Sequence, residues 1–424
     1  MNWEFSEEFA RKMDQKDPLA AFRDRFFIPE ISNEESVYLT GNSLGLQPKT
    51  TAGFINQELN DWAKLGVEGH FHGKTPWFDY HKVLTKTNAD IVGALESEVV
   101  VMNGLTTNLH LLWASFYKPT ERRYKIICEA KAFPSDQYVM ESQAKFHGLN
   151  PQDAIVEVEP RSGEYTIRTE DIIAKIEELG DQVALVFWGG VNYYTGQVFD
   201  MEAITNAGHR VGAKVGLDLA HAAGNVSLKL HDWGVDFAAW CSYKYLNSGP
   251  GNVSGVFVHE RHGEDTELPR FAGWWGHDEN KRFLMEKGFV PTKGAQGWQL
   301  SNAPIFGMAA HRASLEIFNE VGMDKLIIKS RLLVGYLEFI LSQVALKFEN
   351  CNFESITPTK QKEKGCQVSV LLHGQGKSLF DKLTKLGVVA DWREPNVIRM
   401  APVPLYNSFE DIYRFGKKLE ASLC

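Results

Sequence analysis

Two residues, Asp218 and Lys244, have the types and the spacing of a pair that acts on one ligand. Asp218 lies in the apolar run KVGLDLAH, and Lys244 follows the next apolar run in WCSYKYLNSGPGN. If both runs are neighbouring strands of an open α/β sheet, their carboxyl ends meet at the edge where such sheets bind ligands. A carboxylate and an amine would then face the same crevice.

Pyridoxal phosphate chemistry requires this pair. The lysine forms an imine with the cofactor, and the carboxylate keeps the pyridine nitrogen protonated so that the ring can accept electrons. Taken singly, Lys244 would be a loop lysine and Asp218 a helix cap. The joint pattern, with Gly249, Gly251 and Gly255 behind the lysine, predicts a pyridoxal phosphate enzyme whose Lys244 carries the cofactor.

Two further strand ends could hold the rest of the cofactor. Leu105–Thr107 follows the run VVVMNG and opens a predicted helix, whose N-terminal N–H groups favour a phosphate, while Thr106 adds a hydroxyl. FPSD follows KIICEA in the same way. Phe133 could cover the ring while Ser135 and Asp136 bond its substituents. The alternatives are an ordinary helix start and core packing of the phenylalanine.

The histidines are less informative. His221, three residues after Asp218, could hydrogen-bond to that aspartate or to a ring oxygen, or could be a core histidine. The H-x-x-H pair at His259 and His262 lacks the E-x-x-H context of a metalloprotease and is expected at the surface. No metal site is predicted.

Six apolar runs are predicted to be strands because they are rich in β-branched and aromatic residues. They alternate with segments of helical period, as in a mainly parallel α/β sheet. Four helices are expected to open with a Thr, Ser or Asp cap, in TTNLHLLWASFY, SDQYVMESQAKF, TEDIIAKIEEL and DMEAITNAGHR. The strands are Val99–Gly104, Lys125–Ala130, Ala184–Gly190, Lys214–His221, Phe237–Tyr243 and Gly255–His259.

The pattern changes after Asn302. One long helix is predicted from Ile305 to about Val344, followed by a strand in QVSVLLH, a helix in KSLFDKLTKLG, a strand in NVIRMAP and a terminal helix. We expect a helical segment at 1–40, a large cofactor-binding α/β domain at 41–304, and a connecting helix with a small α+β domain at 305–424.

Composition narrows the class of protein. A 424-residue chain with 44% hydrophobic and 23% charged residues suits a globular enzyme. The net charge of −9 with scattered basic residues argues against a nucleic-acid partner. The five cysteines are widely separated, which indicates a reducing compartment, and no export signal or membrane span is visible. We therefore expect a cytoplasmic protein.

At this point the chain resembles one family, the kynureninases. The resemblance covers nearly the whole chain, through YLTGNSLGLQPK, GLTTNLHLL, FPSDQY, YYTGQ, DLAHAAGN, WCSYKYLNSGPG, GWWGH, SNAPI and VIRMAPVPLYNSF. It implies the fold-type-I scaffold, with a mainly parallel seven-stranded-type sheet flanked by helices and a smaller α+β C-terminal domain. It also implies hydrolysis of L-kynurenine or its 3-hydroxy form to an anthranilate and L-alanine, in tryptophan degradation and NAD biosynthesis.

The resemblance assigns roles residue by residue. Lys244, Tyr243 and Asp218 are the implied catalytic residues. The implied cofactor contacts are Leu105, Thr106, Phe133, Ser135, Asp136, Asp218, His221, Tyr243 and Lys244, together with Trp274 and Asn302 from the neighbouring subunit of a homodimer. The implied substrate contacts are Ser43, His70, Ser301, Asn302 and Arg399. Gly189 departs from relatives that carry a hydroxyl residue there, which puts a side-chain phosphate contact in doubt.

Three of these residues bear on substrate choice. His70, Ser301 and Asn302 are polar where kynurenine-preferring relatives carry bulkier or less polar residues, so the resemblance implies a preference for 3-hydroxykynurenine. An unpaired buried hydroxyl costs roughly 1–3 kcal/mol. His70 or Asn302 could supply its partner. Alternatively, His70 caps a loop and Asn302 steadies the phosphate.

Two other functions are alternatives for this sequence. A cysteine desulfurase or selenocysteine lyase of the same fold would need a nucleophilic cysteine, for which Cys351 and Cys366 are the candidates. Against it stand the S-Y-K-Y motif and Phe133, where those enzymes usually show S-x-H-K and a histidine. A catalytically inactive scaffold protein is the other alternative, and the intact Asp218–Lys244 pair argues against it.

Overall fold

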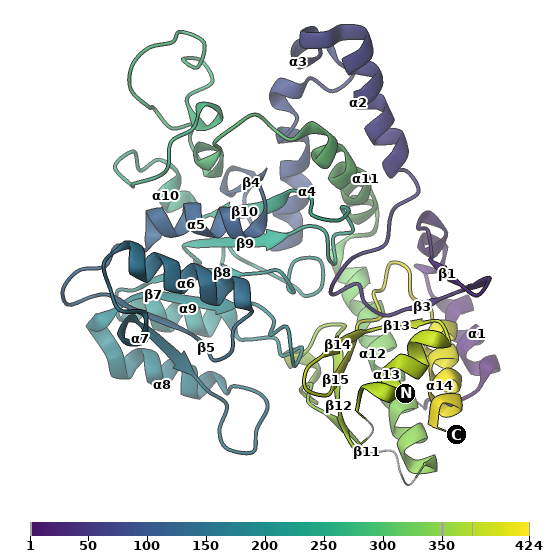
Figure 1. Ribbon diagram of the computed structural model, residues 1–424. Coiled ribbons are helices and arrows are strands. Elements are labelled where there is room, and N and C mark those ends of the chain that lie inside the picture. The colour runs from purple at the N-terminus through teal and green to yellow at the C-terminus, as the bar shows by residue number, and fades with distance from the viewer. Residues whose placement is uncertain (1, 349–351, 375, 424) are drawn as a thin grey trace.

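A seven-stranded sheet forms the centre of the computed structural model, which describes residues 2–348, 352–374 and 376–423. The strands lie in the order β4-β10-β9-β8-β7-β5-β6, with helices on both faces (Figure 1). The predicted α/β class is confirmed. The strand bounds are β4 Val99–Met102, β5 Lys125–Glu129, β6 Ile155–Val158, β7 Val183–Gly189, β8 Lys214–Asp218, β9 Phe237–Cys241 and β10 Ser254–Val258.

Most neighbouring strands of this sheet run parallel. The β6, β5, β7, β8 and β9 strands pair in parallel, whereas β10 pairs antiparallel with both β9 and β4. Residues 242–253 connect β9 to β10 without a helix, so the helical crossover that usually joins parallel strands is absent from this connection. The six predicted strands are present, and β6 is an additional strand that the sequence analysis missed.

The sheet is buried on both faces because alternate residues of one strand enter two different cores. In β4, Val100 and Met102 join the apolar cluster on one face, and Val99 and Val101 join the cluster on the other. This alternation explains why the strands read as continuous apolar runs. The cluster that holds Val100 also contains residues of α5 (Leu105–Phe116) and α6 (Pro134–Phe146), while α8 (Thr169–Leu179) and α9 (Met201–Arg210) contact β7 on the opposite face.

The predicted side-chain caps of these helices were mostly wrong. Asp200 caps α9 by accepting from Ala203 N, as expected. However, α5 begins after Gly104, α6 after Phe133 and α8 after Arg168, and none of these three residues makes a side-chain cap. The hydroxyl residues of these helices lie inside the first turn, where their side chains are free for other contacts.

The predicted single helix from Ile305 to Val344 is two helices. They are α11 (Ile305–Val321) and α12 (Met323–Lys347), and they meet at Gly322, whose φ of +79° a helix interior cannot contain. Beyond them lies an antiparallel sheet in the order β11-β12-β15-β14. The bounds are β11 Asn352–Ser355, β12 Val368–His373, β14 Asp391–Arg393 and β15 Val397–Met400, with helices α13 Lys377–Lys385 and α14 Phe409–Leu423.

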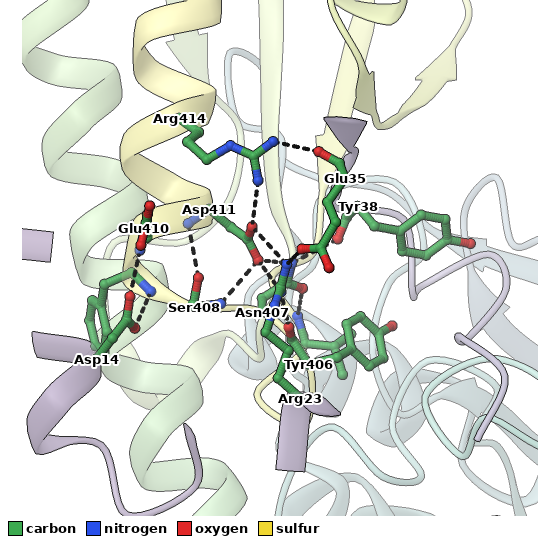
Figure 2. A network of polar contacts seen from close by, with 12 residues as sticks. Asp14, Arg23, Glu35, Tyr38, Tyr406, Asn407, Ser408, Glu410, Asp411 and Arg414 are labelled. Carbon is green, nitrogen blue, oxygen red and sulfur yellow. Dashed lines mark hydrogen bonds and ion pairs between the residues drawn. The ribbon is translucent and has the colours of Figure 1, made fainter. Parts of the chain in front are cut away.

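The N-terminal segment packs on this C-terminal region (Figure 1). Helix α1 (Glu7–Lys16) contacts α14, and β3 (Val37–Tyr38) pairs in parallel with β13 (Val388–Val389). Figure 2 shows the polar contacts that join the two segments. The carboxylate of Asp14 accepts from the backbone of Phe409 and Glu410 at 2.7 and 2.9 Å, so a distant residue satisfies the first N–H groups of α14.

A partly buried ion pair lies at the centre of the same junction. Asp411 accepts from Arg23 Nη1 at 2.6 Å, and Arg23 also pairs with Glu35 at 2.8 Å (Figure 2). Asn407 donates to the carbonyl oxygen of Tyr38 at 2.9 Å. We name the contacts of Asp14, Arg23, Asn407 and Asp411 the terminal clasp.

Helices α2 and α3 form an extension beside α11 (Figure 1). No helix among the described residues is long and apolar enough to cross a membrane. The bounds are β1 Glu30–Ile31, β2 Glu34–Glu35, α2 Thr51–Leu65, α3 Gly69–His72, α4 Lys82–Val92, α7 Pro151–Ala154 and α10 Glu260–Gly263.

Candidate active site

A cavity of about 270 Å³ opens at the carboxyl edge of the central sheet. It collects residues from the ends of four strands and from the first turns of α5 and α6. Nine of the sequence-predicted site residues line it: Leu105, Thr106, Phe133, Ser135, Asp136, Asp218, His221, Tyr243 and Lys244.

The fold brings Asp218 and Lys244 to this edge from neighbouring strands. Asp218 is the last residue of β8, and Lys244 lies three residues beyond the end of β9. Both are buried, with 8% and 9% of their surface exposed. The turn that holds Lys244 is packed against Gly45, whose Cβ, if present, would lie 2.3 Å from the Lys244 carbonyl oxygen. The N-terminal GNSLG motif therefore supports the lysine turn.

Asp136 shares the cavity with Asp218. Burial, then the charge of Asp218 and a hydrogen bond between the two carboxyl groups, raise the pKa of Asp136 well above its ordinary value. Burial also raises the pKa of Asp218, although Ala220 N at 2.6 Å and the charge of Lys244 oppose the shift. Two buried carboxyl groups this close do not both ionise readily, so Asp136 is the one that retains a proton.

His221 faces the cavity as a neutral histidine. Burial and the nearby positive charges of Lys244 and Arg399 lower its pKa well below the ordinary value. Its Nδ1 atom and Asp136 Oδ1 are both buried and have no hydrogen-bond partner among the described residues. Because both atoms belong to residues that line the cavity, they offer hydrogen-bonding capacity to a polar ligand there.

The helix starts of α5 and α6 meet at the cavity. Thr106 Oγ1 and Ser135 Oγ are 2.7 Å apart, so the two hydroxyl groups join the first turns of both helices. The backbone N–H groups and the dipole of α5 favour an anion at this position. Phe133 is partly exposed beside them, and its ring centroid lies 5.8 Å from Lys244 Nζ.

These residues fit pyridoxal phosphate. The cavity offers an amine for the aldehyde group, buried carboxyl groups for the ring nitrogen and substituents, an aromatic ring, and helix N-termini for the phosphate. The unpartnered Asp136 Oδ1 and His221 Nδ1 supply hydrogen-bonding capacity that the described part of the chain does not use.

Sequence reasoning missed Glu129 and Tyr193, which also line the cavity. Glu129 is the last residue of β5, a strand end equivalent to that of Asp218, so the same rule could have found it. Tyr193 lies in the loop after β7, with its ring edge-on to Phe133 at 5.3 Å between centroids. No sequence pattern indicated Tyr193, because its position depends on how this loop folds.

Ser43 and Arg399 come together outside this lining. Arg399 is 1% exposed, so it is not an isolated surface arginine. It forms an ion pair with Asp391, which also accepts from Ser43 Oγ, and Arg399 Nη1 donates to the carbonyl oxygen of Tyr193 at 2.6 Å. Arg399 is therefore connected to the cavity through the Tyr193 loop.

Four other predicted residues lie elsewhere on the chain. His70, Trp274, Ser301 and Asn302 do not line the cavity of this chain. Trp274 is partly exposed, Ser301 and Asn302 are exposed, and His70 Nδ1 is 3.0 Å from the carbonyl oxygen of Val67.

The expectation that the H-x-x-H pair lies at the surface was wrong. His262 is buried, with Nε2 2.7 Å from Asp236 Oδ1, and His259 lies beside buried Glu98. The two imidazoles therefore serve as partners of Asp236 and Glu98, whose carboxylates are buried. Glu98, His231 and His259 place possible ligand atoms within 4.8 Å of one another, but Glu98 Oε1 already accepts from His231 at 2.9 Å and from Glu260 N at 2.8 Å.

The cysteines give no support to the desulfurase alternative. Cys366 is buried, and burial raises the pKa of its thiol to about 12, so it holds no thiolate near neutral pH. Cys351 lies outside the described residues.

Comparison with known proteins gives consistent relatives over the full chain. Residues 328–419 match a family model described as the kynureninase C-terminal domain. A kynureninase of Flavobacterium psychrophilum is 59% identical over 98% of both chains. A kynureninase of Flavobacterium johnsoniae is 59% identical over 100% of this chain and 99% of the other. The mouse kynureninase is 48% identical over 98% and 93%.

Solved structures confirm the scaffold. A cysteine desulfurase from Thermococcus onnurineus has a TM-score of 0.75 at 18% identity and covers 99% of both chains. The cystine C–S lyase C-DES, in complex with cysteine persulfide, has a TM-score of 0.76 at 16% identity and covers 93% of this chain and 99% of the other. At these identities the likeness concerns the fold alone.

Proposed function

This chain belongs to the kynureninase family, and we propose that its cavity binds pyridoxal phosphate on Lys244 to hydrolyse kynurenines, with 3-hydroxykynurenine preferred. The observation that carries the site assignment is the convergence of Lys244, Asp218 and seven other predicted residues on one cavity. The products are L-alanine and anthranilate or 3-hydroxyanthranilate. A cytoplasmic location is part of the same proposal.

Each catalytic residue has a task that its position supports. When bound, the cofactor supplies an electron-accepting ring that stabilises negative charge at the α-carbon of the substrate. Asp218 holds a proton at the pyridine nitrogen, and a cationic ring there would offset the burial that raises the pKa of this carboxyl group. Lys244 Nζ, once the substrate amine has released it, would remove the α-proton, and the neighbouring Tyr243 hydroxyl would move protons between substrate atoms.

The carboxylate of the substrate needs a cation, and Arg399 is the proposed one. Its guanidinium is buried beside the cavity and held by Asp391 and the Tyr193 carbonyl group. Arg399 Nε has no partner among the described residues. A fixed guanidinium can bind a carboxylate through two donors, which sets both charge and orientation. Ser43, within 3.4 Å of Arg399 Nη2, would complete this side of the site.

A homodimer with shared active sites would explain the residues outside the cavity. His70 and Trp274 belong to one aromatic surface, in which Phe71, Phe78 and Phe283 connect them through ring contacts of 5.5–6.3 Å. Apolar side chains close to Phe283 in sequence are strongly exposed, and 79% of the surface of Met285 is accessible to solvent. A large exposed apolar surface is typical of an interface. A second copy seated there could bring His70, Trp274 and Asn302 to the cavity of its partner.

Mixing two inactive variants tests the shared site. Lys244→Ala and Asn302→Ala would each be impaired alone, but a mixed dimer has one site with both native residues. Equal mixing after dissociation should restore up to about a quarter of the wild-type sites. Light scattering should give a dimer mass. A monomer, or no recovery on mixing, would contradict the proposal.

Substrate preference is tested by the specificity constants for the two kynurenines. If His70 or Asn302 satisfies the ring hydroxyl, kcat/KM for 3-hydroxykynurenine should exceed that for kynurenine by about ten- to a hundredfold. His70→Trp combined with Asn302→Thr should move the preference toward kynurenine. If the native enzyme favours kynurenine, or if the double variant keeps its preference, His70 and Asn302 do not determine substrate preference.

A further inference from the structure

Glu129 is a buried carboxyl group in the cavity that the proposed mechanism does not use. It ends β5 and is 4% exposed. Among the described residues, no cation lies within ion-pair distance of it. A charged carboxylate in such a place would be costly unless something compensates it.

Gly189 provides the space that Glu129 occupies. The strands β5, β7 and β8 are neighbours, and their last residues are Glu129, Gly189 and Asp218. A Cβ atom at position 189 would lie 2.6 Å from Glu129 Oε1. The absence of a side chain on the middle strand therefore lets this carboxyl group extend over β7 toward the cavity.

Glu129 also holds the loop that follows β7. Its Oε2 accepts from Asn192 Nδ2 at 2.7 Å. Asn192 Oδ1 in turn accepts from the backbone N–H groups of Tyr194 and Thr195 at 3.0 and 2.8 Å, which closes a tight turn at 192–195.

Tyr193 lies inside this turn and contacts two parts of the site. Its ring meets Phe133, and its carbonyl oxygen accepts from Arg399 Nη1 at 2.6 Å. A change in the Glu129–Asn192 contact would therefore displace the Tyr193 ring, which packs against Phe133. It would also displace the Tyr193 carbonyl group, which holds the Arg399 guanidinium.

The surroundings favour the neutral form of Glu129. Burial and the charge of Asp218 raise its pKa to about 7, against the opposing hydrogen bond from Asn192. The other titratable groups that line the same cavity are Asp218 at the end of β8, His221 after it, Asp136 on α6, Tyr193 after β7, and Tyr243 and Lys244 after β9. Of the two carboxyl groups among them, Asp218 is the one whose charge disfavours ionisation of Glu129, because a second anion beside it would be unfavourable.

We propose that Glu129 is a positioning residue of the active site and that its carboxyl group is protonated below neutral pH. Through Asn192 it fixes the 192–195 turn, and thereby the ring and the carbonyl group of Tyr193. Gly189 is the residue that makes room for it. This inference rests on the proposed function of the cavity.

Thermal unfolding of the full-length protein without cofactor tests the protonation state. The neutral acid is stable in the fold, so its contribution is complete below the ordinary pKa of 4.5 and is lost as pH rises toward the folded value. The Tm of Glu129→Gln minus that of wild type should therefore increase between about pH 5 and about pH 7 and then level off. Exposed Glu157, on the adjacent strand, provides the control Glu157→Gln, for which the difference should stay flat.

Kinetics of the cofactor-loaded enzyme test the positioning role. Glu129→Ala and Asn192→Ala should each raise KM by roughly tenfold with a smaller change in kcat, and the double variant should be no worse than either. Glu129→Gln should restore KM to within about threefold because the amide can still accept from Asn192.

Three results would overturn the inference. They are a pH-independent Tm difference for Glu129→Gln, a Gln variant as impaired as Ala, and additive effects of the two alanine changes. Failure of the proposed function would look different. In that case wild type would not cleave kynurenines, while the Tm dependence of Glu129→Gln would remain.

Discussion

The terminal clasp and the cavity are both clusters of buried or half-buried charged residues, yet their hydrogen bonding differs. In the clasp, both carboxylate oxygens of Asp411 accept from Arg23, and Oδ2 also accepts from Ser408 N at 3.1 Å (Figure 2). In the cavity, Asp136 Oδ1 and His221 Nδ1 have no partner among the described residues.

This difference in hydrogen bonding distinguishes residues that stabilise the fold from residues whose unpaired polar atoms can bind a ligand. A buried polar atom without a partner costs about 1–3 kcal/mol, so a structural cluster is expected to pair its atoms. Raised carboxyl pKa values beside unpaired atoms in a cavity are typical of functional sites. Changes in the cavity should therefore reduce activity, and changes in the clasp should reduce stability.

Lys244→Ala should have the largest effect on activity. Both the link to the cofactor and the base would disappear, so turnover should fall by at least about a thousandfold. Far-ultraviolet circular dichroism should stay native, because Lys244 contributes little to the apolar core. Lys145→Ala, at an exposed position of α6, is the matched control. Substantial product formation by pure Lys244→Ala would contradict the assignment.

Asp218→Ala should follow, with a loss of about a hundred- to a thousandfold in kcat and weaker retention of the cofactor. The pyridine nitrogen would lose its proton without a carboxylate beside it. Asp218→Asn keeps the shape but not the charge, so it should retain more cofactor than Ala with similarly low kcat. Near-normal activity of either variant would place the ring partner elsewhere.

Arg399→Leu should mainly raise KM, by about ten- to a hundredfold, because a guanidinium supplies two donors to a carboxylate. Arg399→Lys keeps the charge but not the planar geometry and should give an intermediate KM. Steady-state kinetics with either kynurenine provide the measurement. An unchanged KM with normal turnover would restrict Arg399 to a structural role with Asp391.

Asp411→Ala should change activity least and stability most. Removal of the buried partner of Arg23 should lower the free energy of unfolding by about 2–4 kcal/mol, measured by denaturant titration. The kcat per bound cofactor should remain at the wild-type value. Glu410→Ala, one residue earlier in α14, is the control. A large fall in kcat without destabilisation would remove the distinction between clasp and cavity.

The central sheet could be predicted because strands buried on both faces read as continuous apolar runs. The runs that became β4, β5, β7, β8, β9 and β10 are of this kind. The strand β6 was missed because Glu157 interrupts its apolar pattern with an exposed charge. The packing of the first 40 residues could not be inferred, since the Asp14 and Asp411 contacts join positions nearly 400 apart in sequence.

The site residues likewise include some that the sequence could predict and some that it could not. Asp218 and Lys244 were predictable because each follows a recognisable strand, and Glu129 obeys the same rule. Tyr193 depends on the turn that Asn192 closes, and only the folded loop places it beside Phe133. In the proposed homodimer, the positions of His70, Trp274 and Asn302 relative to a cavity would depend on a second copy of the chain, whose placement patterns in one sequence do not specify.

The most direct test of the account is to locate the covalent attachment of the cofactor. The purified enzyme should be yellow, and borohydride should bleach it by reducing the link between cofactor and lysine. Mass spectrometry of the digested protein should then find the reduced cofactor on Lys244, in the peptide that contains SYKYLNSGPGN. Attachment to any other lysine, or no attachment in an enzyme that cleaves kynurenine, would contradict the assignment of this cavity.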